Sequence, residues 1–132
     1  MKRVQENWFD GANTSFSFQC ENDISDLQIY DNFVLAGTYN GDVEVWDMTR
    51  GRRMVRMRDQ LGMVQIRTNG VIIVGISDDS TVNVWTFNGE LLKQFHHHKA
   101  SVYGLVVTEQ HAVTGCMLGQ MAVIDLQRMD IE

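Results

Sequence analysis

Three consecutive histidines, His96, His97 and His98, suggest metal chemistry, because imidazole nitrogens are common zinc ligands. Adjacent residues of a strand point to opposite faces of a sheet, so at most two of the three could reach one ion. No cysteine or acidic residue lies close by in the sequence to complete a four-ligand site. We therefore predict a solvated turn with one structural histidine, no metal and no cofactor.

A cysteine paired with a histidine could act as a nucleophile, and the chain has two cysteines, Cys20 and Cys116. Nothing in the sequence arranges a third group to orient the histidine. Cys116 follows Gly115, where a small buried residue is expected. The glycines recur with a repeat described below, which favours turns and close packing over a phosphate-binding loop. We therefore predict no catalytic residue and no enzyme activity.

A run of arginines could bind an acidic partner. It comprises Arg50, Arg52, Arg53, Arg56 and Arg58. On an outermost strand, alternation sends Arg52, Arg56 and Arg58 to one side and Val55 and Met57 to the other. Positive charge on an edge strand discourages pairing between sheets, which is the simpler interpretation.

Size and charge exclude several classes of protein. The chain has 132 residues, the length of one domain, and 44% of them are hydrophobic, enough for a packed core. The formal net charge of −6 argues against nonspecific binding to nucleic acid or membranes. No apolar run reaches the roughly 18 residues of a membrane-spanning helix, and the first residues lack a signal-peptide core. Two cysteines are too few for a disulfide framework, so we expect a cytoplasmic or nuclear location.

Three segments, 35–47, 73–86 and 113–125, can be laid over one another at a spacing of about 40 residues. Each has a short apolar strand that ends at a glycine, a polar turn and an alternating strand that closes on a bulky residue. The glycines are Gly37, Gly75 and Gly115, and the closing residues are Trp46, Trp85 and Ile124. In this alignment the second segment carries one extra residue before its glycine and another in its turn, residues 78–80. Such a period predicts a repeat architecture.

The alternation of apolar and polar residues predicts short strands and no helix. We expect strands at 14–20, 24–29, 33–37, 42–47, 53–58, 61–66, 71–75, 81–85, 91–95, 102–107, 112–115 and 121–125. They form three four-stranded units, 14–47, 52–86 and 91–125, after a linker at 1–13. The prediction is an all-β fold of β-propeller blades. A sandwich or barrel with accidentally similar hairpins is the alternative.

The repeats resemble the WD-repeat (WD40) family over nearly the whole chain. The Trp-Asp pair of that family is complete at Trp46-Asp47 and only half retained at Trp85-Thr86 and Ile124-Asp125. His98 precedes Val102 by four residues, as the histidine of the family does, whereas the matching positions hold Cys20 and Met57. The resemblance implies a network of His, Asp, Ser/Thr and Trp that no unit here completes. The first unit has Thr38, Asn40 and Trp46 without the histidine. The third has His98, but Cys116, Leu118 and Ile124 replace its partners, so His98 is expected to lack a hydroxyl partner. We therefore expect apolar packing to hold the blades.

An Asn-Trp-x-x-Gly segment at 7–11 is similar to F-box/WD-repeat proteins, the substrate receptors of cullin-RING ubiquitin ligases. The simpler interpretation is a Trp that anchors a linker on the edge of the propeller. No F-box is present in the sequence.

By alignment with the family, six residues would form a partner-binding upper rim. They are Ser25, Tyr39, Gly62, Ser77, Tyr103 and Met117. None is an arginine, so phosphopeptide binding is not expected. Tyr39, Tyr103 and Met117 suit a neutral, partly apolar peptide; alternatively, they only line a channel.

The resemblance thus implies a protein-interaction module, plausibly the substrate-recognition part of an F-box-type (SCF) ubiquitin-ligase receptor. A structural scaffold or an inactive partial repeat is the alternative. A propeller hydrolase is less favoured, because it needs carboxylates or histidines at the channel mouth and the rim offers none.

Three blades cannot close a ring, since propellers have about four to eight. The strand at 14–20 has no blade of its own, and the chain ends before an outer strand for its third blade. Two copies could exchange this strand and form a homodimer with a closed six-bladed ring. A fragment of a longer propeller is the competing explanation, which the family favours.

Overall fold

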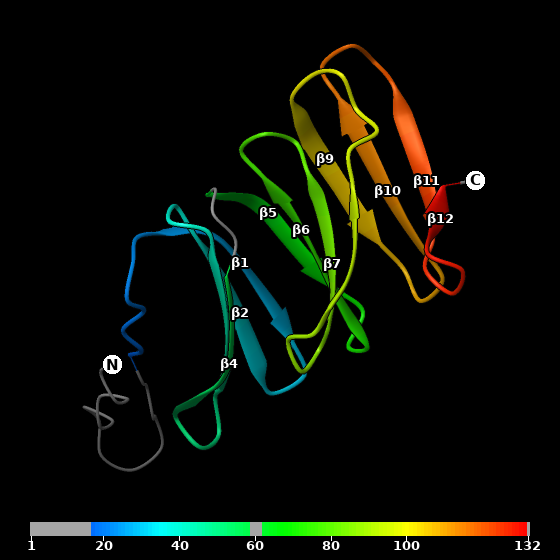
Figure 1. Cartoon of the computed structure of the whole chain (residues 1–132). Helices are drawn as coiled ribbons and strands as arrows, with labels where there is room; N and C mark the ends of the chain where they lie inside the picture. Colours follow the sequence, from blue (N-terminus) through cyan, green and yellow to red (C-terminus); the bar gives the residue numbers. More distant parts are fainter. Residues whose placement is uncertain (1–16, 59–61, 132) are drawn as a thin grey trace.

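The computed structural model describes residues 17–58 and 62–131, which form three four-stranded antiparallel sheets and no helix (Figure 1). The strands are β1 (Ile24–Tyr30), β2 (Phe33–Thr38), β3 (Asp42–Asp47), β4 (Arg52–Arg58), β5 (Met63–Thr68), β6 (Ile72–Ser77), β7 (Val82–Thr86), β8 (Leu91–Phe95), β9 (Val102–Val107), β10 (His111–Cys116), β11 (Met121–Asp125) and β12 (Asp130–Ile131). The prediction of an all-β partial propeller is confirmed. Within the described residues no helix is long and apolar enough to cross a membrane.

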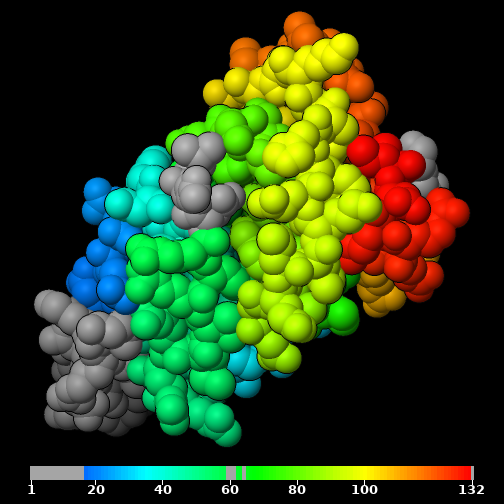
Figure 2. Space-filling view, viewed as in Figure 1, coloured from blue at the N-terminus to red at the C-terminus, as the bar shows by residue number. Residues whose placement is uncertain are grey.

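The three sheets lie side by side in chain order, like part of a fan (Figure 1). Each sheet follows the chain from its inner to its outer strand, so the first is β1-β2-β3-β4. The inner strands contact one another, β1 with β5 and β5 with β9. In the space-filling view the N-terminal and C-terminal sheets occupy opposite ends of the molecule (Figure 2).

Two apolar clusters fill the spaces between the sheets. The first joins the first and second sheets through Leu35, Val43, Val45, Met63, Ile66, Ile73 and Trp85. The second joins the second and third sheets through Val74, Val82, Val84, Val102, Leu105, Ala112 and Ile124. The middle sheet is therefore covered on both faces, which explains why every residue of β6 is buried.

The backbone hydrogen bonds repeat every 39 residues through all three sheets. Met48, Phe87 and Leu126 donate their N–H groups to the carbonyls of Asn32, Val71 and Gln110. In the hairpin turns, Gly41, Ser80 and Gly119 donate to the carbonyls of Thr38, Ser77 and Cys116, and all three donors have positive φ. The units are thus in phase without the two extra residues expected in the second one, and that expectation is wrong.

The closing residues occupy the predicted equivalent places, because Trp46, Trp85 and Ile124 pair with Val34, Ile73 and Ala112. The three glycines at which the apolar strands were expected to end do not occupy equivalent places. Gly37 and Gly115 pair with Val43 and Met121, whereas the residue that pairs with Val82 is Ile76. Gly75 lies one residue earlier, where a Cβ would be 2.9 Å from a ring carbon of Trp85. The glycine at that position accommodates the indole instead of marking the turn.

Two expectations about outer strands are wrong. Residues 14–16 lie outside the described residues, and residues 17–20 form no strand. Instead, Phe18 stacks on Trp46 with ring centroids 5.2 Å apart. The third sheet does have an outer strand, β12, which pairs with Ile124 and Asp125 of β11.

Candidate partner-binding rim

One edge of the fan consists of the β2–β3, β6–β7 and β10–β11 turns and of the residues that precede β1, β5 and β9. One backbone hydrogen bond joins the two parts in each sheet. The N–H groups of Tyr39, Asp78 and Met117 donate to the carbonyls of Asp23, Gly62 and Ser101 over 2.9, 2.9 and 3.0 Å. Tyr39, Asp78 and Met117 therefore hold the same place in the three sheets.

This register corrects two of the six predicted rim residues. Asp78, not Ser77, is the equivalent of Tyr39, and the Ser77 side chain is buried, with Oγ donating to Asp79 Oδ1 over 2.9 Å. Gly62 is also buried and precedes β5, which begins at Met63 rather than at Leu61. The 39-residue period makes Val64 the equivalent of Ser25 and Tyr103. The wrong assignment came from placing the start of β5 two residues too early.

The exposed rim residues are mostly apolar. Tyr39 is 65% exposed, Tyr103 57%, Met117 70% and Leu118 74%, while Ser25 is half-buried. Tyr39 adjoins Ser25 at one end, because Ile24 pairs with Thr38, and Met117 adjoins Tyr103 at the other, because Val102 pairs with Cys116. Leu118 and Asp78 were missed; only the 39-residue register places them here. We call Ser25, Tyr39, Asp78, Tyr103, Met117 and Leu118 the upper rim.

A shallow polar hollow of about 300 Å³ lies between the tyrosine-bearing ends of the upper rim. Its lining residues are Asp78, Asp79, Ser80, His98, Lys99, Ala100 and Ser101. The Thr81 hydroxyl and backbone hold the pKa of Asp79 below its usual range, so this carboxylate is ionised near neutral pH. Ser80 Oγ accepts a hydrogen bond from the Val102 N–H over 3.0 Å and so ties the turn to the third sheet.

The histidines contact threonine hydroxyls. His98 Nε2 lies 2.7 Å and His97 Nε2 3.1 Å from Thr114 Oγ1, and His96 Nδ1 lies 3.2 Å from Thr81 Oγ1. The expectation that His98 lacks a hydroxyl partner is wrong, because Thr114 supplies it. Burial and the neighbouring His98 lower the pKa of His97, which favours its neutral form. No group of three His, Cys, Asp or Glu in the described part of the chain could hold a metal ion.

The Asp of the Trp-Asp pair has a structural role. Asp47 Oδ1 accepts from the Thr49 N–H and hydroxyl at 2.9 and 2.6 Å, and Asp125 Oδ1 accepts from the Gln127 and Arg128 N–H groups at 2.9 and 3.0 Å. Both carboxylates therefore fix the turn that leads to the outer strand. At the equivalent place in the second sheet, Thr86 Oγ1 accepts from the Glu90 N–H over 3.0 Å.

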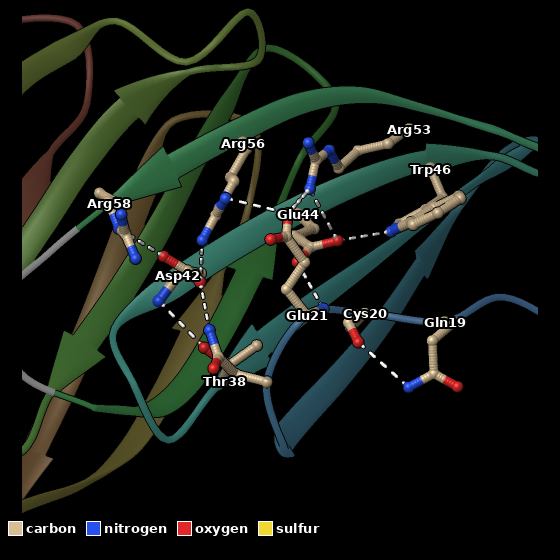
Figure 3. Close-up of polar contacts among 11 residues, drawn as sticks. Gln19, Cys20, Glu21, Thr38, Asp42, Glu44, Trp46, Arg53, Arg56 and Arg58 are labelled. Carbon is tan, nitrogen blue, oxygen red and sulfur yellow. Dashed lines mark hydrogen bonds and ion pairs between the residues drawn. The ribbon is translucent and has the colours of Figure 1, made fainter. Parts of the chain in front are cut away.

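The arginines of β4 bind acidic residues of their own sheet (Figure 3). Asp42 is fully buried, and its carboxylate oxygens lie 2.8 Å from Arg56 Nη2 and 3.1 Å from Arg58 Nε. The register shifts between Val45 and Trp46, which leaves Met54 unpaired as a bulge. The bulge turns Arg53, instead of the predicted Arg52, to the side of Arg56 and Arg58. The expectation of strict alternation along this strand is therefore wrong.

A second buried carboxylate, Glu44, replaces the family network in the first sheet (Figure 3). Its Oε1 accepts from Trp46 Nε1 over 3.0 Å, and Arg53 lies 3.7 Å away. Burial, and then the charge of Glu44, raise the pKa of the Cys20 thiol to about 11. Glu21 completes the cluster by pairing with Arg53 and Arg56 at 2.7 and 3.0 Å. The sequence signal for this cluster was present, as acidic residues on β3 facing arginines on β4, but the arginines were interpreted as charges that prevent pairing between sheets.

Comparisons with known proteins identify related chains. No protein-family model matches the chain. It is 27% identical over 107 residues to "WD repeat and SOCS box-containing protein 1" of Mus musculus, and equally to the proteins of that name from Homo sapiens and Danio rerio. The match covers 76% of this chain and 25% of the relative, so the chain spans about a quarter of these relatives.

Solved structures show the same fold at low identity. The computationally designed Ika4 protein aligns with a TM-score of 0.79 at 24% identity over 88% of this chain and 74% of its own. The WD40 β-propeller domain of Doa1 aligns with a TM-score of 0.73 at 17% identity, over 91% and 42% of the two chains. BamB from Moraxella catarrhalis aligns with a TM-score of 0.72 at 23% identity, over 80% and 32%.

Proposed function

Because the three sheets are WD40 repeats of a β-propeller, a fold typical of protein–protein interaction, we propose that this chain binds a segment of a partner protein on the upper rim. The observation that carries the proposal is the exposure of Tyr39, Tyr103, Met117 and Leu118 on turns held by the same hydrogen bond in each sheet. Tyrosine and methionine are enriched in protein interfaces, where large, partly apolar side chains bury much area. No catalytic step is part of this function.

The acidic middle of the upper rim refines the chemistry of the partner. Asp78 and Asp79 are exposed between the apolar ends and outnumber Lys99, the exposed cation that lines the same hollow, and the chain has a net charge of −6. These carboxylates repel phosphate and attract lysine or arginine. We therefore propose an apolar peptide segment with a basic residue, instead of the neutral segment expected from the sequence or a phosphopeptide.

A role as the substrate-recognition part of a ubiquitin-ligase receptor is the finer form of this proposal. Its support is the resemblance of the repeats to F-box/WD-repeat proteins and the relatives' name, which pairs WD repeats with a SOCS box. The 7–11 segment lies outside the described residues. Cys20 and Cys116 are both free, which is consistent with the cytoplasmic or nuclear location that we propose.

Selection from a peptide library displayed on phage tests binding on the upper rim. The immobilised protein should enrich apolar peptides with a basic residue, and the triple variant Tyr39→Ala, Tyr103→Ala, Met117→Ala should bind them at least about tenfold more weakly, the loss of a typical interface anchor. A matched control is Val71→Ala with Leu92→Ala, which removes apolar side chains that are 73% and 45% exposed but distant from the rim. Equal loss in the control, or unchanged binding by the triple variant, would contradict the proposal. Absence of any enrichment would favour the alternative function, a structural scaffold.

A further inference from the structure

The free face of the third sheet carries the apolar pattern that the other sheets bury. We call the face of a sheet that packs on the next sheet along the chain its forward face, and the opposite one its back face. On the forward faces of the first two sheets, Leu35, Val43, Val45, Val74, Val82 and Val84 are all 0% exposed. The same places on the third sheet hold Val113, Met121 and Val123. No further sheet of the described chain packs on this face, where Met121 is 76% exposed and Val113 and Val123 are half-buried.

The back face of the first sheet carries the complementary pattern. In the second and third sheets the back faces present Met63, Ile66, Val102 and Leu105, each no more than 6% exposed. The same places on the first sheet hold Ile24 and Leu27, which are 44% and 56% exposed. Toward the outer strand this face is already covered, because Phe18 stacks on Trp46. The open part is therefore the inner half of the back face.

Glycines show which face fits which. A Cβ at Gly37 would lie 3.1 Å from Met63 Cβ and 3.3 Å from Ile66 Cγ2, so this glycine allows the back face of the second sheet to approach closely. Gly115 holds the place of Gly37 on the third sheet, and a Cβ there would meet nothing within 4 Å. Ile24 and Leu27 hold the places of Met63 and Ile66. A second copy of the chain thus offers Gly115 the contact that Gly37 already makes.

We propose that two copies of this chain associate head to tail, the forward face of each third sheet packing on the back face of the other copy's first sheet. Each contact joins unlike faces, and two such contacts related by a two-fold axis close the ring with six sheets. Six sheets are within the range of closed propellers, about four to eight blades. The contact does not require exchange of the 14–20 segment, because Phe18 and Cys20 are engaged in their own sheet.

Light scattering coupled to size exclusion tests the association. The chain should elute at twice its mass of 15.1 kDa. Leu27→Asp blocks the back face and Met121→Asp blocks the forward face, and each variant alone should be monomeric, because every contact needs one face of each kind. Mixing the two variants should restore a dimer that is weaker than that of the wild type, since only one of its two contacts joins an intact forward face to an intact back face. Leu92→Asp on β8 is the control and should leave the dimer intact. The exposed fraction of Leu92, 45%, matches the 44% of Ile24 on the proposed back-face contact.

Several outcomes would overturn the proposal. A wild-type monomer at about 100 µM, well above usual dimer dissociation constants, excludes the contact. A dimer lost in only one of the two variants indicates like faces in contact, and a mass that grows with concentration indicates an open filament. Leu27 and Met121 are exposed, so both variants should retain the β-sheet circular dichroism of the wild type; an unfolded variant is replaced by Ile24→Asp or Met121→Lys at the same face.

Discussion

Asp42 is a single buried residue whose carboxylate stabilises the first sheet. Its carboxylate is fully buried, yet it accepts hydrogen bonds from Asn22, Arg56 and Arg58 at 2.7, 2.8 and 3.1 Å. Removing its charge abolishes two ion pairs of a buried carboxylate, those with Arg56 and Arg58, so Asp42→Asn should lower the free energy of unfolding by about 2–4 kcal/mol. Urea unfolding measures the change. Asp78→Asn, at an exposed carboxylate, should stay within about 0.5 kcal/mol of the wild type.

The same carboxylate predicts an acid-dependent loss of stability. Burial opposes ionisation of Asp42, but hydrogen bonds from Arg56 and Asn22 outweigh it and hold its pKa below the usual 3.8. The folded state therefore binds fewer protons than the unfolded state, and the stabilisation is complete above pH 3.8 and lost as the pH falls through the lower, folded pKa. Unfolding free energies measured at decreasing pH should fall more steeply for the wild type than for Asp42→Asn. Parallel curves would show that Asp42 is not the responsible group.

Cys20 should be an unreactive thiol. Its pKa of about 11 leaves roughly one thiolate in a thousand at pH 8, and its side chain is buried. Cys116 is only partly buried, so iodoacetamide at pH 8 should modify it well before Cys20. Mass spectrometry of the tryptic peptides gives the order. Glu44→Gln removes a charge that raises this pKa, and should accelerate labelling of Cys20 without changing that of Cys116.

At the scale of the strand, Gly75 and Gly115 differ in the space available for a larger side chain. A Cβ at Gly75 would lie 2.9 Å from the Trp85 ring and 3.0 Å from Met63 Sδ, so Gly75→Ala should cost about 1–3 kcal/mol. Gly115 has open space, so Gly115→Ala should stabilise the isolated chain by about 0.5 kcal/mol through the unfolded state. Both should be measured by urea unfolding in the Leu27→Asp background, which removes the proposed contact between copies. Equal effects would contradict the different roles assigned to them.

The strands could be predicted from the sequence because they depend on local alternation and turn chemistry. β3, β8, β9 and β11 have the predicted bounds, and the Trp46, Trp85 and Ile124 places are those predicted. The pairing register between strands was harder to predict from the sequence. Gly75 aligns in the sequence with Gly37 and Gly115, although Ile76 holds the equivalent place in the structure. The register shift between Val45 and Trp46, which changes the side to which Arg53 points, has no local signal in the sequence.

The candidate site depended on that register, so only part of it was predictable. Tyr39, Tyr103 and Met117 are exposed where the sequence placed rim residues. Asp78 was missed because an error of one residue moves a side chain to the other face of a strand. The buried cluster around Asp42 and Glu44 was missed for a different reason: a carboxylate is normally assigned to solvent, and only the folded sheet brings Arg53, Arg56 and Arg58 over it.

For the molecule as a whole, stability should be greatest in the middle sheet. Its strands β6 and β7 pack on both neighbouring sheets, whereas the first and third sheets each have one face without a neighbour in the described chain. In such a linear array each sheet is stabilised mainly by its neighbours, so the ends open at lower free energy than the centre.

Hydrogen exchange can measure this gradient by comparing strands at equivalent places. β7 (Val82–Thr86) pairs along four of its residues with β8, but β11 (Met121–Asp125) pairs with β12 only at Ile124 and Asp125. Amides of β11 should therefore exchange at least about tenfold faster than those of β7 in the monomeric Leu27→Asp variant, by local opening instead of global unfolding. In the wild-type chain the proposed contact covers the third sheet and should narrow this difference. Equal protection of β7 and β11 in the monomer would mean that the three sheets open as one cooperative unit.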